Sequence, residues 1–382
     1  MFGVAEQVGS PLGWICDDAL PYKGVGPIRV RSGLHLYEDV PAGRNTAMWS
    51  ITNHTPYKAK KTWGRDKDGV HEWIVAVKGT YDIKADGTVV LANEQLDPLL
   101  APEYNGEPGV SSLRYDADLV APKPTTDVVI NGTAYAPKGR PSTEFLVSVR
   151  VAQIHKVIRV VGNRRWKRGL FGLKPSKAEP ITQLPIIYER AYGGYDQTDP
   201  DPKKQRMDPR NPVGCGVVAK SKNRLGQPLP NFQYPKGSIE KAGPAGFGAI
   251  DSHWSPRREL MGTYDKAWQQ HRLPLLPEDW DPHSLQCAPK DQRPDMHLFG
   301  GEDVELVNLT PNGVLRFILP KVHCIFSTRI DGRREEHRSR VSTVIIEPDN
   351  SRVMMVWLTS LACRTNVDYL EETVVREKPY IR

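Results

Sequence analysis

Histidine and cysteine side chains in the C-terminal half of the chain are the residue types that could hold a metal ion. They stand at His283, Cys287, His297, His323 and Cys324. Zinc ligands usually come in close pairs, such as two cysteines separated by two residues, because one backbone turn then offers two donors to one ion. The spacing of these five residues does not follow that pattern, so the sequence predicts no metal site.

Carboxylates that could serve as acid and base in a hydrolase are plentiful in the loops. Examples are Glu189, Asp196, Asp265, Asp279 and Asp281. A glycosidase holds two carboxyl groups on opposite sides of one bond at a defined separation, and no motif here indicates such a pair. The G-x-S-x-G elbow of serine hydrolases and the phosphate-binding pattern G-x-x-x-x-G-K-[ST] have no match in the chain. We therefore predict no catalytic residue and no cofactor, and a polysaccharide-active or other hydrolase on a β scaffold stays the alternative function.

A basic run with an aromatic residue inside it, Asn163-Arg-Arg-Trp-Lys-Arg168, has the composition that stacks on single-stranded nucleic acid. Lys174 and Lys177 follow it. The apolar run Val157–Val161 directly before it has the pattern of a strand that ends in a loop, and a charge run of this kind is usually solvated. We therefore expect a hairpin tip here and no nucleic-acid partner.

The elements that must position these residues are short strands. Glycine and proline number 32 and 33, and proline is disfavoured inside helices because it lacks the amide hydrogen and clashes with the preceding turn. In one apolar run the odd-numbered residues from Phe145 to Val151 share one face, which is typical of a half-buried antiparallel strand. The runs with strand character are Glu72–Lys78, Val128–Ile130, Phe145–Val151, Val157–Val161, Leu315–Leu319 and Val353–Leu358.

Short connections and caps complete the expected fold. Asp-Gly and Asn-Gly pairs predict tight hairpins because such turns need positive φ angles. These pairs are Asp68-Gly69, Asp86-Gly87, Asn312-Gly313 and Asp331-Gly332. Two short helices are expected, one capped by Thr263 over Tyr264–His271 and one capped by Asn366 over Val367–Arg376. The sequence thus predicts a mainly β fold of antiparallel, sandwich-like sheets with long ordered loops and a few short helices.

Three long segments, dense in Pro, Gly, Asp and aromatic residues, resist interpretation as strands. They are residues 1–47, 193–248 and 273–301. Loops of this length are usually functional. We expect an N-terminal extension over residues 1–47 and a β-rich domain over residues 48–382, with a subdivision of that domain near residues 200–235.

Composition is typical of a soluble globular protein. The net charge of +7 over 382 residues is a mild excess that demands neither nucleic acid nor membrane as a partner. Five scattered cysteines without a C-x-x-C pair favour reduced thiols over a secreted disulfide framework. Residues 1–21 lack the basic and apolar regions of a signal peptide, and no run approaches the ~18 apolar residues of a membrane-spanning helix. We expect a cytoplasmic protein with no membrane partner.

A series of unusual strings runs in order through most of the chain. From about Met48 to Leu319, these strings make the chain resemble a bacterial family defined by a domain of unknown function and met in type VI secretion gene clusters. The resemblance implies a non-enzymatic adaptor or chaperone that binds a secreted effector toxin and helps to load it onto the VgrG-type spike protein. The strings include Asn53-His-Thr-Pro56, Val77-Lys-Gly-Thr-Tyr81, Ser112-Leu-Arg-Tyr-Asp-Ala-Asp118, Pro122-Lys-Pro-Thr-Thr-Asp127, Tyr188-Glu-Arg-Ala-Tyr-Gly-Gly194, Arg210-Asn-Pro-Val-Gly214, Trp254-Ser-Pro-Arg257, Gly262-Thr-Tyr-Asp265 and Ala288-Pro-Lys-Asp-Gln292.

Some residues of these strings and loops are candidates either to bind the partner or to pin the loops onto the sheets. Arginine forks can bond carbonyls or carboxylates, glycine permits unusual backbone conformations, and exposed tryptophans anchor interfaces. For the arginines and glycines we favour loop pinning, and for the aromatic residues interface contact wherever they are exposed. The candidates are Arg164, Trp166, Arg190, Gly193, Gly194, Arg210, Asn211, Trp254, Tyr264, Trp268 and Trp280.

Overall fold

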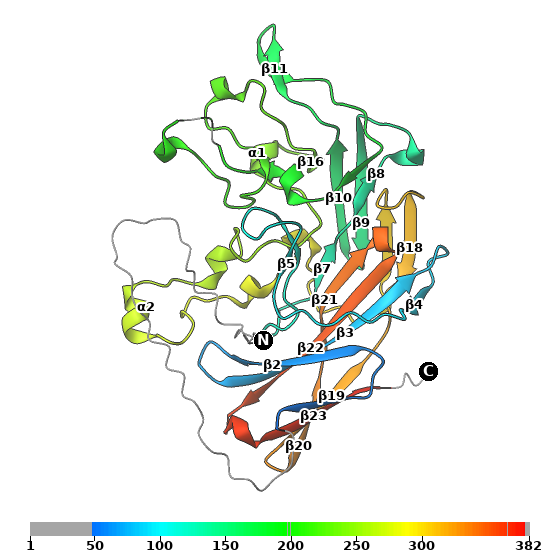
Figure 1. Cartoon of the computed structure of the whole chain (residues 1–382), viewed down its shortest axis with the longest axis vertical. Coiled ribbons are helices and arrows are strands. Elements are labelled where there is room, and N and C mark those ends of the chain that lie inside the picture. Colours follow the sequence, from blue (N-terminus) through cyan, green and yellow to red (C-terminus); the bar gives the residue numbers. More distant parts are fainter. Residues whose placement is uncertain (1–47, 197, 199, 365, 379–382) are drawn as a thin grey trace, which may run out of the picture.

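The computed structural model describes residues 48–378, apart from residues 197, 199 and 365 (Figure 1). Within that range the fold is mainly β with several antiparallel sheets and few short helices, as the sequence predicts. The expected N-terminal extension lies outside the described residues.

The largest sheet lies at the centre of the molecule (Figure 1). Its strand β3 is buried from Trp73 to Tyr81 because both of its faces are covered. Val75 and Val77 belong to the main core, whereas Ile74 and its neighbours on the other face pack with Leu119 from a loop. The strand order is β2 (Lys58–Arg65), β3 (His71–Ile83), β22 (Arg352–Cys363), β21 (Arg340–Glu347) and β7 (Asp127–Ile130), and β4 (Val89–Leu91) pairs with the end of β3.

A five-stranded sheet packs its inner face onto the same core. The odd-numbered residues from Phe145 to Val151 are all buried and Arg150 is exposed, which confirms the predicted alternation. The outer face of this sheet carries charged and half-exposed side chains. Its strand order is β16 (Phe232–Gln233), β10 (Ile154–Val161), β9 (Glu144–Val151), β17 (Asp303–Val307) and β18 (Val314–Ile318).

Smaller elements flank these two sheets. A four-stranded sheet has the order β1 (Ser50–Asn53), β23 (Leu370–Glu377), β19 (Cys324–Ile330) and β20 (Arg333–Arg338). The two-stranded ribbons are β5 (Glu103–Tyr104) with β6 (Leu113–Tyr115), β8 (Thr133–Tyr135) with β13 (Gln183–Pro185), β11 (Trp166–Gly169) with β12 (Gly172–Pro175), and β14 (Tyr192–Gly193) with β15 (Cys215–Gly216).

The described helical segments are short and lie mostly in the long loops, on one side of the sheets (Figure 1). The α-helices are α1 (Ile239–Ala242) and α2 (Lys266–His271). The 3-10 turns are η1 (Pro137–Gly139), η2 (Tyr188–Arg190), η3 (Pro202–Lys204), η4 (Ser221–Arg224), η5 (Arg258–Met261), η6 (Pro282–Leu285), η7 (Lys290–Gln292), η8 (Pro348–Asn350) and η9 (Val367–Tyr369).

The structure confirms the predicted turns but changes both predicted helices. All four Gly-containing pairs form hairpin turns, with positive φ angles at Gly69, Gly87, Gly313 and Gly332. The helix expected after Thr263 begins later, because the Asp265 side chain is the cap that accepts the Trp268 amide.

The helix predicted over Val367–Arg376 is wrong. Asn366 does cap a turn, since its side chain accepts the Asp368 amide, but the turn ends at Tyr369. The chain continues as strand β23, which pairs with both β19 and β1, so cross-strand pairing overrides the local helix signal there.

Candidate functional site

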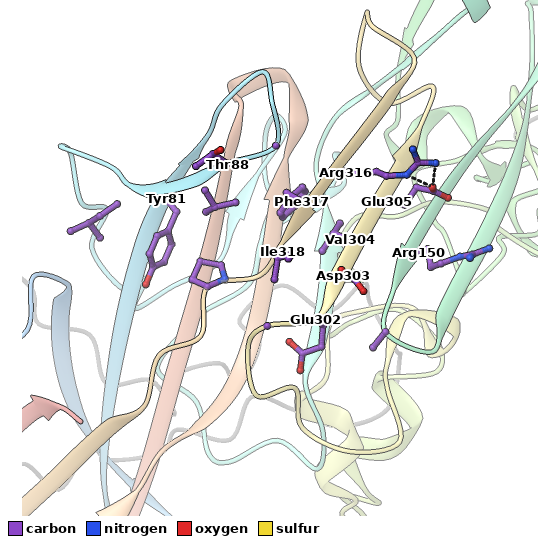
Figure 2. Close-up of a pocket in the computed structure, with 16 residues that line it drawn as sticks. Tyr81, Thr88, Arg150, Glu302, Asp303, Val304, Glu305, Arg316, Phe317 and Ile318 are labelled. Atoms are coloured by element: carbon purple, nitrogen blue, oxygen red, sulfur yellow. Dashed lines mark hydrogen bonds and ion pairs between the residues drawn. The ribbon is translucent and has the colours of Figure 1, made fainter. Parts of the chain in front are cut away.

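An open groove of about 1020 Å³ lies between the β3–β4 hairpin and strands β17 and β18 (Figure 2). Tyr81, Val89 and Leu91 line it from the hairpin, and Ile318 and Pro320 line it from the end of β18. Leu91 and Ile318 are 42% and 56% exposed. The groove therefore has an apolar half that is open to solvent.

A row of charged side chains gives the groove its polar half. The register places Arg316 of β18 opposite Glu305 of β17, and Glu305 opposite Arg150 of β9. The guanidinium of Arg316 donates to the Glu305 carboxylate at 2.7 Å from Nε and 2.6 Å from its terminal nitrogen (Figure 2). The lining as a whole carries the guanidinium groups of Arg150 and Arg316 and three carboxylates from residues 302–305, so its polar half holds charges of both signs.

Strand β18 is the edge of its sheet, and its outer edge opens into this groove. The Leu319 amide donates to the Glu302 carbonyl at 2.9 Å, so alternation along the ladder turns the backbone groups of Arg316 and Ile318 away from β17. The hairpin turn covers part of this edge, since a Cβ atom added at Gly87 would lie 2.2 Å from the Arg316 carbonyl oxygen. The part at Ile318 stays beside the groove.

The acidic residues that line the groove all come from one stretch, residues 302–305. Glu305 is paired with Arg316, and Glu302 accepts the Phe299 amide at 2.7 Å. In the described lining, the opposite wall from β3 and β4 contributes no carboxylate. The carboxylates of the groove therefore all lie on the β17 side.

Residues of the unusual strings quoted above form buried ion pairs beneath the long loops. The Lys78 ammonium of β3 lies 2.9 Å from the Asp118 carboxylate, and each side chain is 3% exposed. The Lys123 ammonium lies 2.8 Å from the Asp127 carboxylate at the start of β7, with exposures of 2% and 0%. The Asp127 carboxylate also accepts the Cys287 amide at 2.8 Å. These contacts fasten two loops to the central sheet.

Arg257 fastens a third loop in the same region. Its guanidinium lies 2.9 Å from the Asp116 carboxylate and donates to the carbonyl oxygens of Ile250 and Ser284. The string Trp254-Ser-Pro-Arg257 thus ends on a buried arginine that joins three loop segments.

The protonation states of this buried cluster suit a structural role. Burial lowers the pKa of Lys123, but the nearby acidic groups, of which Asp127 contributes most, together outweigh burial and raise that pKa. Burial raises the pKa of Asp127, but the Lys123 ammonium, the Arg293 guanidinium and the Cys287 amide together outweigh burial and lower that pKa. Burial raises the pKa of the Cys287 thiol. At neutral pH the lysine is charged and the thiol is protonated, so neither is a nucleophile.

The predicted residues Gly193, Gly194 and Asn211 form one tight loop crossing. The φ angles of the two glycines are 147° and 93°. A Cβ atom would lie 2.2 Å from the Asn211 carbonyl oxygen at Gly193, and 2.2 Å from the Gly214 carbonyl oxygen at Gly194. The buried Asn211 amide group donates to the Tyr188 carbonyl at 2.8 Å. These are the contacts of loop pinning.

Arg190, Arg210 and Trp254 lie in the same cluster of loops. The Arg210 guanidinium binds Asp208 with two hydrogen bonds of 2.9 and 2.7 Å. The half-buried Arg190 ends η2, and Trp254 is buried against the Tyr188 ring at a centroid distance of 5.7 Å. Trp254 therefore packs inside the protein and does not lie at the surface.

Three other predicted aromatic residues, Tyr264, Trp268 and Trp280, lie in or near α2, apart from that cluster. Tyr264 is 47% exposed and meets the Trp268 ring edge-on at 4.8 Å. The indole N–H of Trp268 donates to the Leu275 carbonyl at 2.9 Å, and Trp280 is half-buried. Only Tyr264 of these three presents a largely exposed ring.

Arg164 and Trp166 lie at the base of the β11–β12 ribbon. Arg164 is half-buried, and burial lowers the pKa of its guanidinium. Trp166 is half-buried beneath the Arg224 guanidinium, 5.8 Å from its ring centroid. The basic run thus belongs to a hairpin, but it forms the base and the first strand, whereas the prediction placed it at the tip, which is Leu170 and Phe171.

The sequence interpretation missed the buried lysines. Lys78 and Lys156 each stand inside an apolar strand, and Lys156 lies 2.8 Å from the Asp291 carboxylate with a side chain that is 1% exposed. A lysine between buried positions of a strand needs a partner, because an unpaired buried charge is costly. A lysine inside an apolar strand pattern could therefore have identified the aspartates of the quoted strings as its partners.

Two further findings concern the described part of the chain. No group of three or more His, Cys, Asp or Glu side chains there is arranged to hold a metal ion. No described helix is long and apolar enough to cross a membrane.

The fold and these surfaces define a class of protein: a mainly β scaffold whose long loops are held by buried ion pairs beside an open groove. The chain belongs to the family described as uncharacterized protein conserved in bacteria (DUF2169), whose profile matches residues 68–358. The match begins later and extends further than the resemblance seen in the sequence. No curated protein and no solved structure matches the chain.

Proposed function

We propose that this chain is a binding adaptor that holds a segment of a type VI secretion effector and helps to load it onto the VgrG-type spike protein. The observation that supports the proposal most is the amphipathic groove beside the edge of β18. It is large, open, apolar on one side and charged on the other. An extended polypeptide segment, with side chains alternating in character, has the shape and chemistry for such a groove.

The fastened loops, whose ion-paired residues do not line the groove, are a second feature that supports a binding role. Long loops fastened by buried ion pairs lose little conformational freedom when a partner binds, and preorganisation of this kind raises affinity. The link to type VI secretion itself comes from the strings quoted above, and the family that the profile defines is uncharacterized.

Co-expression with a candidate type VI effector, followed by size-exclusion chromatography, tests the proposal. We expect the chain to co-elute with the effector and, in a second experiment, with the spike protein. Co-elution with neither contradicts the adaptor.

A matched pair of variants ties the binding to the groove. Ile318→Asp places a charge in the apolar half of the groove. Burial of an isoleucine side chain against a partner contributes about 1.5–3 kcal/mol to the free energy of binding, so we expect the affinity for the effector to fall roughly tenfold or more. Val110→Asp changes an apolar residue that is 73% exposed and does not line the groove, so it should leave the affinity unchanged. Equal affinities of the two variants would remove the groove from the proposal.

A further inference from the structure

The β11–β12 ribbon ends in two fully exposed apolar side chains. Leu170 and Phe171, in the turn between the strands, are 96% and 104% exposed. The ribbon stands out from the body of the molecule at one end of its long axis (Figure 1). Large apolar residues placed together at a protruding tip are candidates for a contact with another molecule.

The stem of the ribbon is basic and has no acid of its own. From Asn163 to Ala178 the chain carries six Lys and Arg residues and no Asp or Glu. The register places Lys167 directly opposite Lys174, and like charges in that arrangement repel each other. Among the described residues, no acidic side chain pairs with Lys167, Arg168 or Lys174. These three side chains are exposed, so they are free to meet acidic groups of another molecule.

The base of the ribbon is held firmly, so the tip is presented in a defined place. The Trp166 amide donates to the Gln227 carbonyl at 3.0 Å, and the Gly226 amide donates to the Trp166 carbonyl at 2.8 Å. The Arg165 guanidinium donates to the Gly226 carbonyl at 3.0 Å. Arg224, over the Trp166 ring, is itself paired with Glu240 at 2.8 Å.

We infer that the β11–β12 ribbon is a docking arm whose Leu170 and Phe171 enter an apolar pocket with a carboxylate-lined rim on a partner protein. The inference rests on the proposed function, in which the partner is the effector or the spike protein. The arm is a second contact surface, apart from the groove. The partner pocket that fits it has an apolar floor and acidic walls.

The placement of charge favours a concave protein over a flat lipid surface. The cations are spread along a stem whose four residues per strand span about 13 Å. A flat anionic surface at the tip acts strongly only within a Debye length of about 8 Å, so the base of the stem gains little from it. Acidic walls of a pocket can reach the whole length of the stem.

Affinity measurements with the purified effector and spike protein test the inference. The double variant Leu170→Ser/Phe171→Ser should bind its partner about 30-fold more weakly or worse, because two buried anchors are lost. The double variant Lys167→Glu/Lys174→Glu should weaken binding and reduce its dependence on salt. Arg333→Glu/Arg334→Glu, on the exposed strand β20, is the control for charge and should bind as the unaltered chain does.

Photocrosslinking places the contact directly. Phe171→p-benzoylphenylalanine should crosslink to the partner, and Tyr369→p-benzoylphenylalanine, at a site that is 50% exposed, should not. Suppose that the unaltered chain binds, that Leu170→Ser/Phe171→Ser binds with the same affinity, and that the crosslinker at position 171 forms no crosslink to the partner. The inference is then overturned while the adaptor stands. If the unaltered chain binds neither protein, the adaptor and the docking arm both fall.

Two further probes test the other classes of partner. Vesicles containing phosphatidylserine and a single-stranded oligonucleotide should not bind through the tip. Binding of either probe that is lost in Leu170→Ser/Phe171→Ser would assign the arm to lipid or nucleic acid and overturn the inference.

Discussion

Single buried charged residues of the quoted strings hold the loops onto the central sheet. Lys123→Met removes the hydrogen-bonded cation of the buried Asp127 carboxylate and leaves only the Arg293 guanidinium, 4.0 Å away, which we expect to cost about 3–5 kcal/mol in the free energy of unfolding. The double variant Lys123→Met/Asp127→Asn keeps an acceptor for the Cys287 amide and removes the charge, so it should recover part of that loss. Chemical denaturation of both variants measures the difference, and equal losses would contradict the ion-pair account.

His337 is a second residue whose environment fixes its charge. Burial lowers its pKa to about 4. The Thr359 hydroxyl donates to the Arg338 carbonyl, so it accepts from Nδ1–H of the ring at 2.7 Å. Nε2 is then the acceptor for the Thr328 hydroxyl, also at 2.7 Å. Both ring nitrogens thus have hydroxyl partners, and burial disfavours the charged imidazolium.

The stability of the fold should therefore depend on acid through His337. An unfolded histidine has a pKa of about 6.5, so between pH 6.5 and 4 the unfolded chain binds a proton that the folded protein does not. The free energy of unfolding should fall over that window as the pH falls, by on the order of 2–3 kcal/mol. The variant His337→Gln should lose this dependence, and His155→Gln, at an exposed histidine, should keep it. If the free energy of unfolding depends on pH in the same way for the unaltered chain and both variants, His337 is not responsible.

At the level of elements, the loop crossing at Gly193 and Gly194 sets the shape of the loop region. Gly194→Ala meets both a positive φ of 93° and the Gly214 carbonyl oxygen at 2.2 Å. Gly237→Ala is a matched control, because its φ is 90° but nothing lies within 4 Å. We expect Gly237→Ala to cost about 1–2 kcal/mol for the backbone alone and Gly194→Ala to cost clearly more. Thermal unfolding of the two variants compares them, and similar melting temperatures would show that the crossing can relax.

The elements were largely predictable where local pattern and tertiary packing agree. The alternation from Phe145 to Val151 and the Asp331-Gly332 turn carry their structure in the sequence itself. Val367–Arg376 reads as a helix locally, but its residues pair with two other strands, and such distant pairing leaves no local signal. The subdivision near residues 200–235 stays a prediction.

The candidate site was less predictable than the fold. The groove joins side chains from β3, β4, β9, β17 and β18, which are up to about 240 residues apart in the sequence. The pairing of Lys78 with Asp118 is likewise a contact between separate strings. A single sequence gives residue types at such positions, but their meeting depends on how the sheets pack.

At the scale of the whole molecule, the two proposed contact surfaces lie apart from each other. The groove lies beside the β3–β4 hairpin, and the β11–β12 ribbon stands at the end of the long axis (Figure 1). An adaptor that must hold a cargo and also meet a spike protein needs separate surfaces for the two tasks. This arrangement is consistent with the proposed function and gives each surface its own variants.

Hydrogen exchange of the chain with and without the effector tests the central claim most directly. The account predicts slower exchange in the complex at the β3–β4 turn and along residues 314–320, because a bound segment covers the edge of β18. Exchange in β20, which does not line the groove, should not change. A stable complex without protection of residues 314–320 would contradict the groove as the binding site.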